Sequence, residues 1–201
     1  MIRILLTVLI ALFSFPILPA RAAEVYTLDK PHTQILFTID HLGFSQSTGK
    51  FLDYSGSFTL DRLNPENSSV NVTINTDSLD LGDQVWNEHM KKADFFNVAA
   101  FPVMTFRSTS VSPTGSDTAD VAGDLTILGV TRPVVLKVRH NKSGPLPFGE
   151  KFIAGFNAET TIKRSDFGMD YGLPMVGDDV AIRISAEGVQ EGYQGASKGK
   201  E

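Results

Sequence analysis

Hydrophobic and polar side chains alternate along most of the chain, with the period of two that half-buried β-strands require. In residues 34–40, Ile35, Phe37 and Ile39 share one face, and polar side chains occupy most of the other. The same alternation returns in residues 52–60, 70–75, 103–111, 119–127, 134–139, 152–162 and 180–187. Glycine, proline and asparagine separate these segments, and short turns favour antiparallel neighbours. The pattern therefore predicts about eight antiparallel strands.

One stretch, residues 83–102, lacks this alternation and has the spacing of an α-helix. Asp83 is suited to the N-cap position, and Pro102 prevents any continuation. The face predicted to be apolar carries Val85, Trp86, His89 and Met90. One short helix among strands can close the open end of a barrel, with its apolar face directed into the interior.

The apolar faces of the predicted strands are rich in phenylalanine, methionine and branched aliphatic residues, and no Lys, Arg, Asp or Glu shares them in the clear strand segments. Closing an eight-stranded sheet removes its exposed edges and leaves an interior for side chains or for one small ligand. An uncharged interior could hold an apolar ligand, or core side chains could fill it completely. The pattern leaves both interpretations open.

The N-terminus has the features of a secretory signal peptide. Arg3 provides the positive charge, residues 4–15 form an apolar run, and Ala20-Arg21-Ala22 has the small-x-small form of a cleavage site. The run is short for a membrane span, although an uncleaved anchor is the alternative. We expect a signal peptide over 1–22, one domain over 23–190 and a flexible tail over 191–201.

Composition excludes several classes of function. The formal net charge is −5 and there is no basic patch, so we expect no nucleic-acid partner. The chain has no cysteine, which excludes thiolate metal sites, cysteine nucleophiles and disulfides. No nucleophile elbow, glycine-rich phosphate loop or H-E-x-x-H motif is present. We therefore expect a protein that is not an enzyme.

The histidines and loop charges offer weaker signals. A metal site would require the ligands to come from separate loops, and no metal is predicted. We interpret Asp94, Arg164 and Asp166 as structural loop residues. An Arg–Asp pair joining the helix region to the later loop would form a bidentate clamp. The enzymatic alternative is a hydrolase or isomerase that uses His89, Asp94 or Asp166.

Three motifs resemble those of the YceI-like polyisoprenoid-binding proteins. Residues 89–96, with His-Met and Asp-Phe-Phe, resemble the family's His-Leu…Asp-Phe-Phe-Asp segment. Residues 123–134 resemble G-x-L-T-I-x-G-V-T-x-P-V, and residues 164–169 match R-S-D-F-G-M. The resemblance extends over residues 23–190. The chain departs from the pattern at Trp86-Asn87, where Arg-Asp is common, at Met90, where Leu is usual, and at Asn97, where Asp is usual.

The resemblance implies an all-β fold: an eight-stranded antiparallel, lipocalin-like barrel with one short capping helix. It also implies that the lumen binds a long-chain isoprenoid, of quinone or polyprenyl type, or a related long-chain amphiphile. We accordingly expect an exported periplasmic carrier that is not an integral membrane protein and has no cofactor besides a non-covalently bound isoprenoid lipid. The resemblance also implies formation of a homodimer. The alternative from another class is a ligand-free stress or interaction protein with a packed barrel.

Parity, the helix and the motifs together predict the residues that contact the ligand. These are Phe37, Ile39, Phe58, Trp86, His89, Met90, Met104, Phe106, Leu136, Phe152, Phe156, Phe167, Met169 and Ile182.

Overall fold

The computed structural model describes residues 23–147 and 150–194, which form strands and a few short helices. The strands are β1 (Glu24–Leu28), β2 (Gln34–His41), β3 (Ser45–Phe51), β4 (Tyr54–Leu60), β5 (Ser69–Asn75), β6 (Leu79–Asp80), β7 (Val103–Pro113), β8 (Thr118–Ile127), β9 (Val130–Pro145), β10 (Phe152–Lys163) and β11 (Val176–Gln190). The helices are α1 (Gln84–Met90) and the 3-10 turns η1 (Lys30–His32), η2 (Pro65–Asn67), η3 (Thr76–Ser78) and η4 (Arg164–Phe167).

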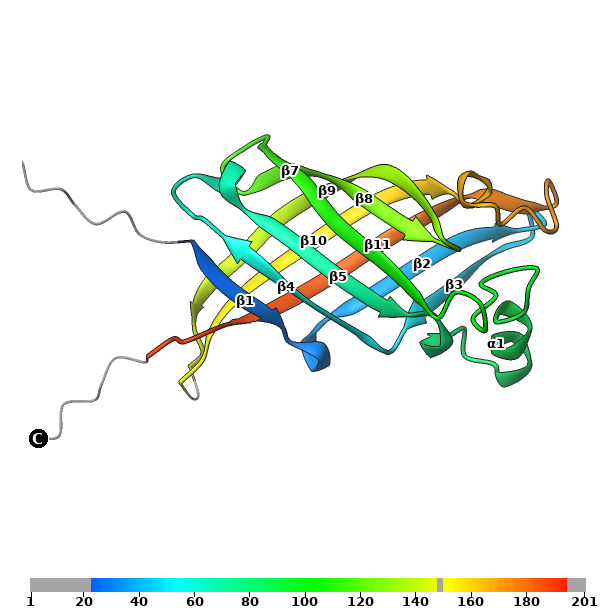
Figure 1. Cartoon of the computed structure of the whole chain (residues 1–201), viewed down its shortest axis with the longest axis horizontal. Helices are drawn as coiled ribbons and strands as arrows, with labels where there is room; N and C mark the ends of the chain where they lie inside the picture. The colour runs from blue at the N-terminus through cyan, green and yellow to red at the C-terminus, as the bar shows by residue number, and fades with distance from the viewer. Residues whose placement is uncertain (1–22, 148–149, 195–201) are drawn as a thin grey trace, which may run out of the picture.

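The strands form a closed antiparallel barrel, as the sequence predicted (Figure 1). A ring of eight runs in the order β1-β4-β5-β7-β8-β9-β10-β11, and β11 pairs back onto β1. The remaining segments, β2, β3 and β6, extend from β11 toward one end of the barrel. There β2 replaces β1 as the neighbour of β11, and β3 replaces β4 as the next strand. Eleven segments therefore trace the eight strand positions of one barrel.

Two breaks separate successive strands in the first third of the chain. Between β1 and β2, Pro31 lies in η1, where it cannot donate a ladder hydrogen bond. Between β3 and β4 the chain bends at Leu52, whose backbone N–H donates to the carbonyl of Ser78 instead. Leu52 was predicted to share the inward face of its segment but is 52% exposed, because the bend takes it out of the alternation.

Helix α1 is shorter than predicted. It starts where expected, with the Asp83 carboxylate accepting the Trp86 backbone N–H at 2.8 Å, but it ends at Met90 rather than continuing toward Pro102. The chain then coils through successive turns that bury Phe95 and Phe96, and this burial replaces further helical hydrogen bonds. None of the helices in residues 23–147 and 150–194 combines the length and apolar character needed to cross a bilayer.

The two ends of the barrel differ in character (Figure 1). One end carries α1, the β2–β3 turn and the loop that follows η4, and we call it the helix end. The other end carries the first and last described residues of the chain, and we call it the terminal end. The predicted tail boundary lies here: Glu191 donates its backbone N–H to Val25, while residues 195–201, like 1–22, lie outside the described residues.

Candidate ligand-binding cavity

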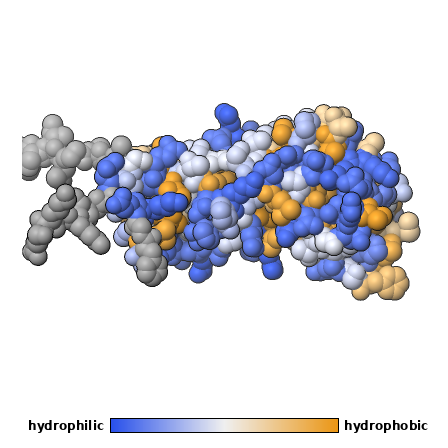
Figure 2. All heavy atoms as spheres, turned by 90° about the horizontal axis from the view of Figure 1, so that it is seen from below, coloured by the Kyte–Doolittle hydropathy of each residue, from blue (hydrophilic) through white to orange (hydrophobic). Residues whose placement is uncertain are grey.

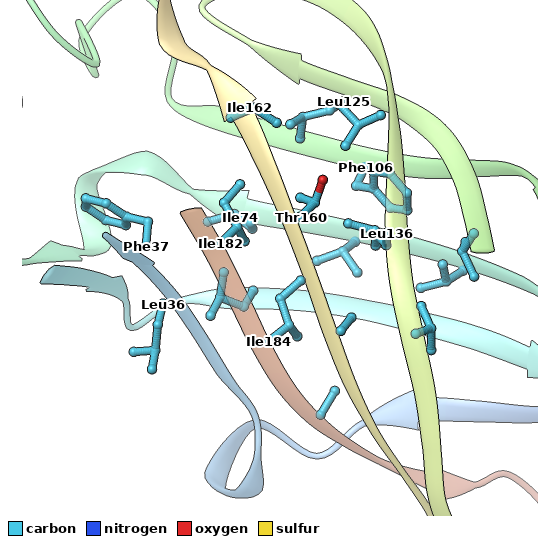
Figure 3. Close-up of a pocket in the computed structure, with 18 of the residues that line it drawn as sticks. Leu36, Phe37, Ile74, Phe106, Leu125, Leu136, Thr160, Ile162, Ile182 and Ile184 are labelled. Atoms are coloured by element: carbon cyan, nitrogen blue, oxygen red, sulfur yellow. The ribbon is translucent and has the colours of Figure 1, made fainter. Parts of the chain in front are cut away.

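The inward faces of the strands enclose a cavity of about 700 Å³. Its wall consists almost entirely of aliphatic and phenylalanine side chains, as Figure 3 shows for part of the lining. The lining extends from α1 to the β4–β5 and β7–β8 loops, so the cavity follows most of the barrel's length. Charged lining residues such as Asp61, Arg62 and Arg164 lie at the barrel ends. An interior of this kind excludes water from apolar ligands but does not stabilise a charged one.

All the predicted ligand-contacting residues except Phe152 line this cavity. The barrel wall contributes Phe37, Ile39, Phe58, Met104, Phe106, Leu136, Phe156 and Ile182. The helix end contributes Trp86, His89 and Met90 from α1, and Phe167 and Met169 from the η4 region. Strand parity explains why these side chains face inward together. Phe37 pairs with Ile182, and Ile182 pairs with Thr160, so their side chains lie at one level of the same inner face.

Phe152 has the inward parity but lies beyond the cavity. Its ring packs beside the core cluster of Tyr26, Phe58 and Ala154 at the terminal end. It also lies 5.2 Å from the ring of Tyr193 and 5.3 Å below the guanidinium carbon of Arg62. Parity identifies the face of a strand that a residue occupies, but not how far along the barrel the open lumen extends.

Val85 was also predicted to face the cavity, and it does not. Trp86, His89 and Met90 turn one side of α1 toward the cavity, at the i, i+3 and i+4 positions of a helical face. A helix of only seven residues presents little more than that one stripe, and Val85 is left 80% exposed. The prediction that Val85 faces the lumen is therefore wrong.

Thr160 is a polar lumen residue that the sequence analysis missed. It lies in the second half of β10, three residues before Lys163, and Figure 3 shows its hydroxyl among Ile74, Phe106, Leu136 and Ile182. Its position was available from the sequence, because residue 160 continues the parity of Phe156 and Ile162. A hydroxyl there can donate a hydrogen bond to one polar atom of a ligand within an otherwise apolar wall.

Three phenylalanine rings each extend over a glycine of the barrel wall. The pairs are Phe37 over Gly49, Phe58 over Gly188, and Phe106 over Gly123. A Cβ atom on any of these glycines would lie closer than 3.0 Å to carbons of its partner ring. The absent side chains at these glycines therefore leave the space that the three rings occupy.

Aromatic rings surround the cavity at the helix end. The Trp86 ring lies edge-on to His41 at 6.4 Å between centroids. His89 packs on Phe95 at 5.1 Å, and Phe95 in turn contacts Tyr171 at 5.3 Å. Of the candidate acid–base residues His89, Asp94 and Asp166, only His89 lines the cavity, so these three do not form one site.

Arg164 does not form the Arg–Asp clamp that the sequence suggested. The side chain is 4% exposed and donates to four backbone carbonyls. The acceptors are those of Gly177, Met169, Tyr171 and Val176, at 2.8, 2.7, 2.9 and 3.2 Å. Asp178 instead accepts both the backbone N–H and the hydroxyl of Ser165. Arg164 thus ties the loop after η4 to the start of β11, using its N–H groups on the backbone rather than on a ligand.

A possible metal-binding group lies outside the cavity. Within the described residues, ligand atoms of Asp29, His32 and Glu187 come within 4.8 Å of one another. The His32 ring already lies 2.8 Å from the Asp29 carboxylate, which raises the pKa of the imidazole through that hydrogen bond. None of the three lines the cavity.

His140 provides a pH-dependent contribution at the terminal end of the cavity. Its ring packs on Phe156 at 5.1 Å, and burial, followed by the nearby Arg62, lowers the pKa of this imidazole below its ordinary 6.5. The unfolded chain then binds the proton more readily, so this residue's contribution to stability should be full above about pH 6.5 and should decline as the pH falls toward the lowered pKa.

We therefore expect His140→Gln to flatten the pH dependence of the unfolding free energy below pH 7. Urea titrations of both proteins at several pH values provide the measurement. Subtracting one unfolding free energy from the other at each pH cancels the contribution of His32, which has the opposite sign and is present in both proteins. Parallel curves for the two proteins would contradict the assignment.

Comparisons with known proteins place the fold and the cavity in a wider context. A model of the YceI-like domain matches residues 26–188. The proteins named Protein YceI from Salmonella arizonae and Salmonella heidelberg are each 45% identical over 174 residues, covering 86% of this chain and 90% of theirs.

Solved structures have the same architecture. BcnA from Burkholderia cenocepacia matches with a TM-score of 0.72 at 26% identity, covering 80% of this chain and 98% of its own. The YceI protein of Campylobacter jejuni has a TM-score of 0.68 at 30% identity, covering 75% and 88%. A polyisoprenoid-binding domain from Saccharophagus degradans has a TM-score of 0.64 at 16% identity, covering 82% and 98%; at that identity the likeness concerns the fold alone.

Proposed function

This chain belongs to the YceI-like family, and we propose that its barrel binds and carries a long-chain isoprenoid, of quinone or polyprenyl type, or a related amphiphile. The observation that carries the proposal is the apolar cavity of about 700 Å³, which has the size typical of small-molecule sites. The name of the Saccharophagus degradans domain, which shares the fold, points to the same ligand class.

The physical basis of binding would be desolvation. Each buried methylene contributes about 0.8 kcal/mol before the costs of association. Drug-sized ligands realise about 0.3 kcal/mol per heavy atom, so a tail of about 20 apolar atoms gives about 6 kcal/mol and one of about 40 gives about 12. These energies correspond to micromolar and nanomolar dissociation constants, respectively. Tight binding therefore requires a long tail or additional contacts to a polar group, such as the one that Thr160 offers.

Two other classes of function fit the geometry less well. A ligand-free interaction protein with a packed barrel does not need an open cavity. A hydrolase or isomerase would require acid–base groups gathered around a substrate, whereas His89 lines the cavity without Asp94 or Asp166.

The direct test is to identify what the protein carries. The protein should be purified from its own host without detergent and measured by native mass spectrometry, then by denaturing mass spectrometry with lipid extraction. We expect a co-purifying isoprenoid in native spectra that is released on unfolding. A protein that is empty, and that takes up no isoprenoid quinone or polyprenol when these are added, would refute the proposal.

We also propose that the protein acts after export to the periplasm. The support is the signal-peptide pattern over residues 1–22. N-terminal sequencing of the exported protein is expected to begin at about Ala23. Recovery of the intact N-terminus in the membrane fraction would instead indicate an anchor.

The fluorescence of Trp86 reports on the cavity, because Trp86 is the only tryptophan in the sequence and lines the cavity at the helix end. Adding an isoprenoid quinone to delipidated protein should quench or shift its fluorescence in a saturable way. If Trp86 contacts the ligand, Trp86→Ala should weaken binding by about 1–3 kcal/mol, the scale for one large apolar side chain. If it packs only on protein, the substitution should lower the melting temperature and leave affinity within about twofold. Unchanged fluorescence on proven loading would contradict ligand contact.

A further inference from the structure

Exposed apolar side chains gather at the helix end of the barrel. Phe44 in the β2–β3 turn is 89% exposed, Val85 on α1 is 80% exposed, and Met175 before β11 is 66% exposed. Leu42, Trp86 and Tyr171 are also exposed at this end. Figure 2 shows apolar side chains reaching the surface at the end away from the grey terminal residues. We call these six residues the apolar rim.

The apolar rim lies at the end of the barrel where α1 and the loop after η4 cover the cavity. Its three segments are held together by the Leu42 backbone N–H, which donates to the Met175 carbonyl at 3.2 Å, and by the ring contact between His41 and Trp86. Trp86 and Tyr171 belong both to the rim and to the cavity lining. A surface that presses on the rim would therefore contact two side chains that also line the cavity.

The segments that carry the apolar rim are acidic. Residues 40–45, 83–90 and 170–176 contain Asp40, Asp83, Glu88 and Asp170 but no Lys or Arg. Lys91 and the exposed Lys92 directly follow the helix, and Lys91 is paired with Asp77 and Glu88, so acidic side chains still outnumber basic ones around the rim. A two-fold dimer through the rim would place these carboxylates against their own copies. An anionic bilayer would also repel them, whereas a zwitterionic one would not.

We propose that the apolar rim docks on the surface of a zwitterionic lipid bilayer, with Phe44, Val85 and Met175 inserted and the helix end of the cavity directed at the acyl chains. Leucine, valine, methionine and aromatic side chains on protruding segments suit the boundary between headgroups and acyl chains. The proposal rests on the proposed function, because it supplies the route by which an isoprenoid would pass between bilayer and barrel without crossing water.

Vesicle flotation tests the docking. Purified mature chain is mixed with phosphatidylcholine vesicles and, separately, with phosphatidylglycerol vesicles. We expect co-flotation with phosphatidylcholine and weaker co-flotation with phosphatidylglycerol. Phe44→Ser/Val85→Ser should lower the partition coefficient at least about tenfold, because two exposed anchors are lost. Leu63→Ser is the matched control: Leu63 is 73% exposed but lies in the β4–β5 loop at the terminal end, and its substitution should change nothing.

Further measurements separate docking from loading and from self-association. Trp86 fluorescence should shift to the blue on phosphatidylcholine vesicles in the parent and not in the double variant. Failure of the parent to float, or flotation of the double variant equal to the parent's, would overturn docking even if mass spectrometry shows a loaded cavity. Rim-dependent flotation would support docking even if the cavity takes up no isoprenoid, a result that would refute the proposed function alone. A parent dimer that the double variant converts to a monomer, without vesicle binding, would show that the rim is a self-interface and overturn docking.

Discussion

Phe106→Asp is expected to cost at least about 4 kcal/mol of unfolding free energy and to abolish loading with lipid. Phe106 is buried and lines the cavity with its ring over Gly123. Truncating a buried phenylalanine alone costs about 3–5 kcal/mol, and the aspartate adds a charge to an uncharged space. Since domains are stable by only about 5–15 kcal/mol, much of the total would be lost. Phe156→Asp should behave in the same way.

Urea denaturation and native mass spectrometry would measure these effects. Thr109→Asp, at an exposed position of the same strand, is the matched control and should stay within about 0.5 kcal/mol of the parent. If both phenylalanine variants remained folded and loaded with lipid, the inward orientation of these strand faces would be wrong.

Arg164→Met is the second substitution with a large expected effect. It keeps most of the side-chain volume but leaves the carbonyls of Gly177, Met169, Tyr171 and Val176 without their donor. Each buried acceptor left unsatisfied costs about 1–3 kcal/mol. Some of these carbonyls would regain water, and we therefore expect a total loss of about 3–5 kcal/mol. Hydrogen exchange should also accelerate in the loop after η4.

Two further substitutions test whether the lost backbone hydrogen bonds cause the destabilisation of Arg164→Met. Arg164→Lys keeps the charge but cannot reproduce the forked geometry, so its loss should be intermediate. Arg132→Met removes an exposed arginine with one hydrogen bond to the Asp166 carbonyl and should cost less than about 1 kcal/mol. A cost for Arg164→Met as small as that for Arg132→Met would show that the four backbone contacts contribute little to stability.

The fold could be predicted from the sequence because alternation with a period of two encodes which side of a strand is buried. Phe37 and Ile182 were assigned to the inner face by parity, and they lie opposite each other across the β2–β11 pair. The N-cap at Asp83 was also predictable, since a side-chain oxygen at that position satisfies a backbone N–H of the first turn.

The errors occurred where long-range contacts decide the structure. Helix α1 ends early because burial of Phe95 and Phe96 outweighs local helix propensity. The role of Arg164 depends on four carbonyls between residues 169 and 177, whose orientation no local pattern encodes. Charge signs alone therefore suggested an ion pair where the structure uses backbone acceptors.

The pairing of β1 with β11 has a consequence for the order of folding. Thr27 near the beginning and Glu191 near the end are 164 residues apart in sequence yet joined by a side-chain hydrogen bond. The ring of strands cannot be completed until nearly the whole chain has been synthesised, and contacts between residues so distant in sequence form slowly. We expect a nascent chain to remain incompletely folded until β11 becomes available. Under the export to the periplasm proposed above, that delay would keep the chain in the unfolded form suited to threading across a membrane.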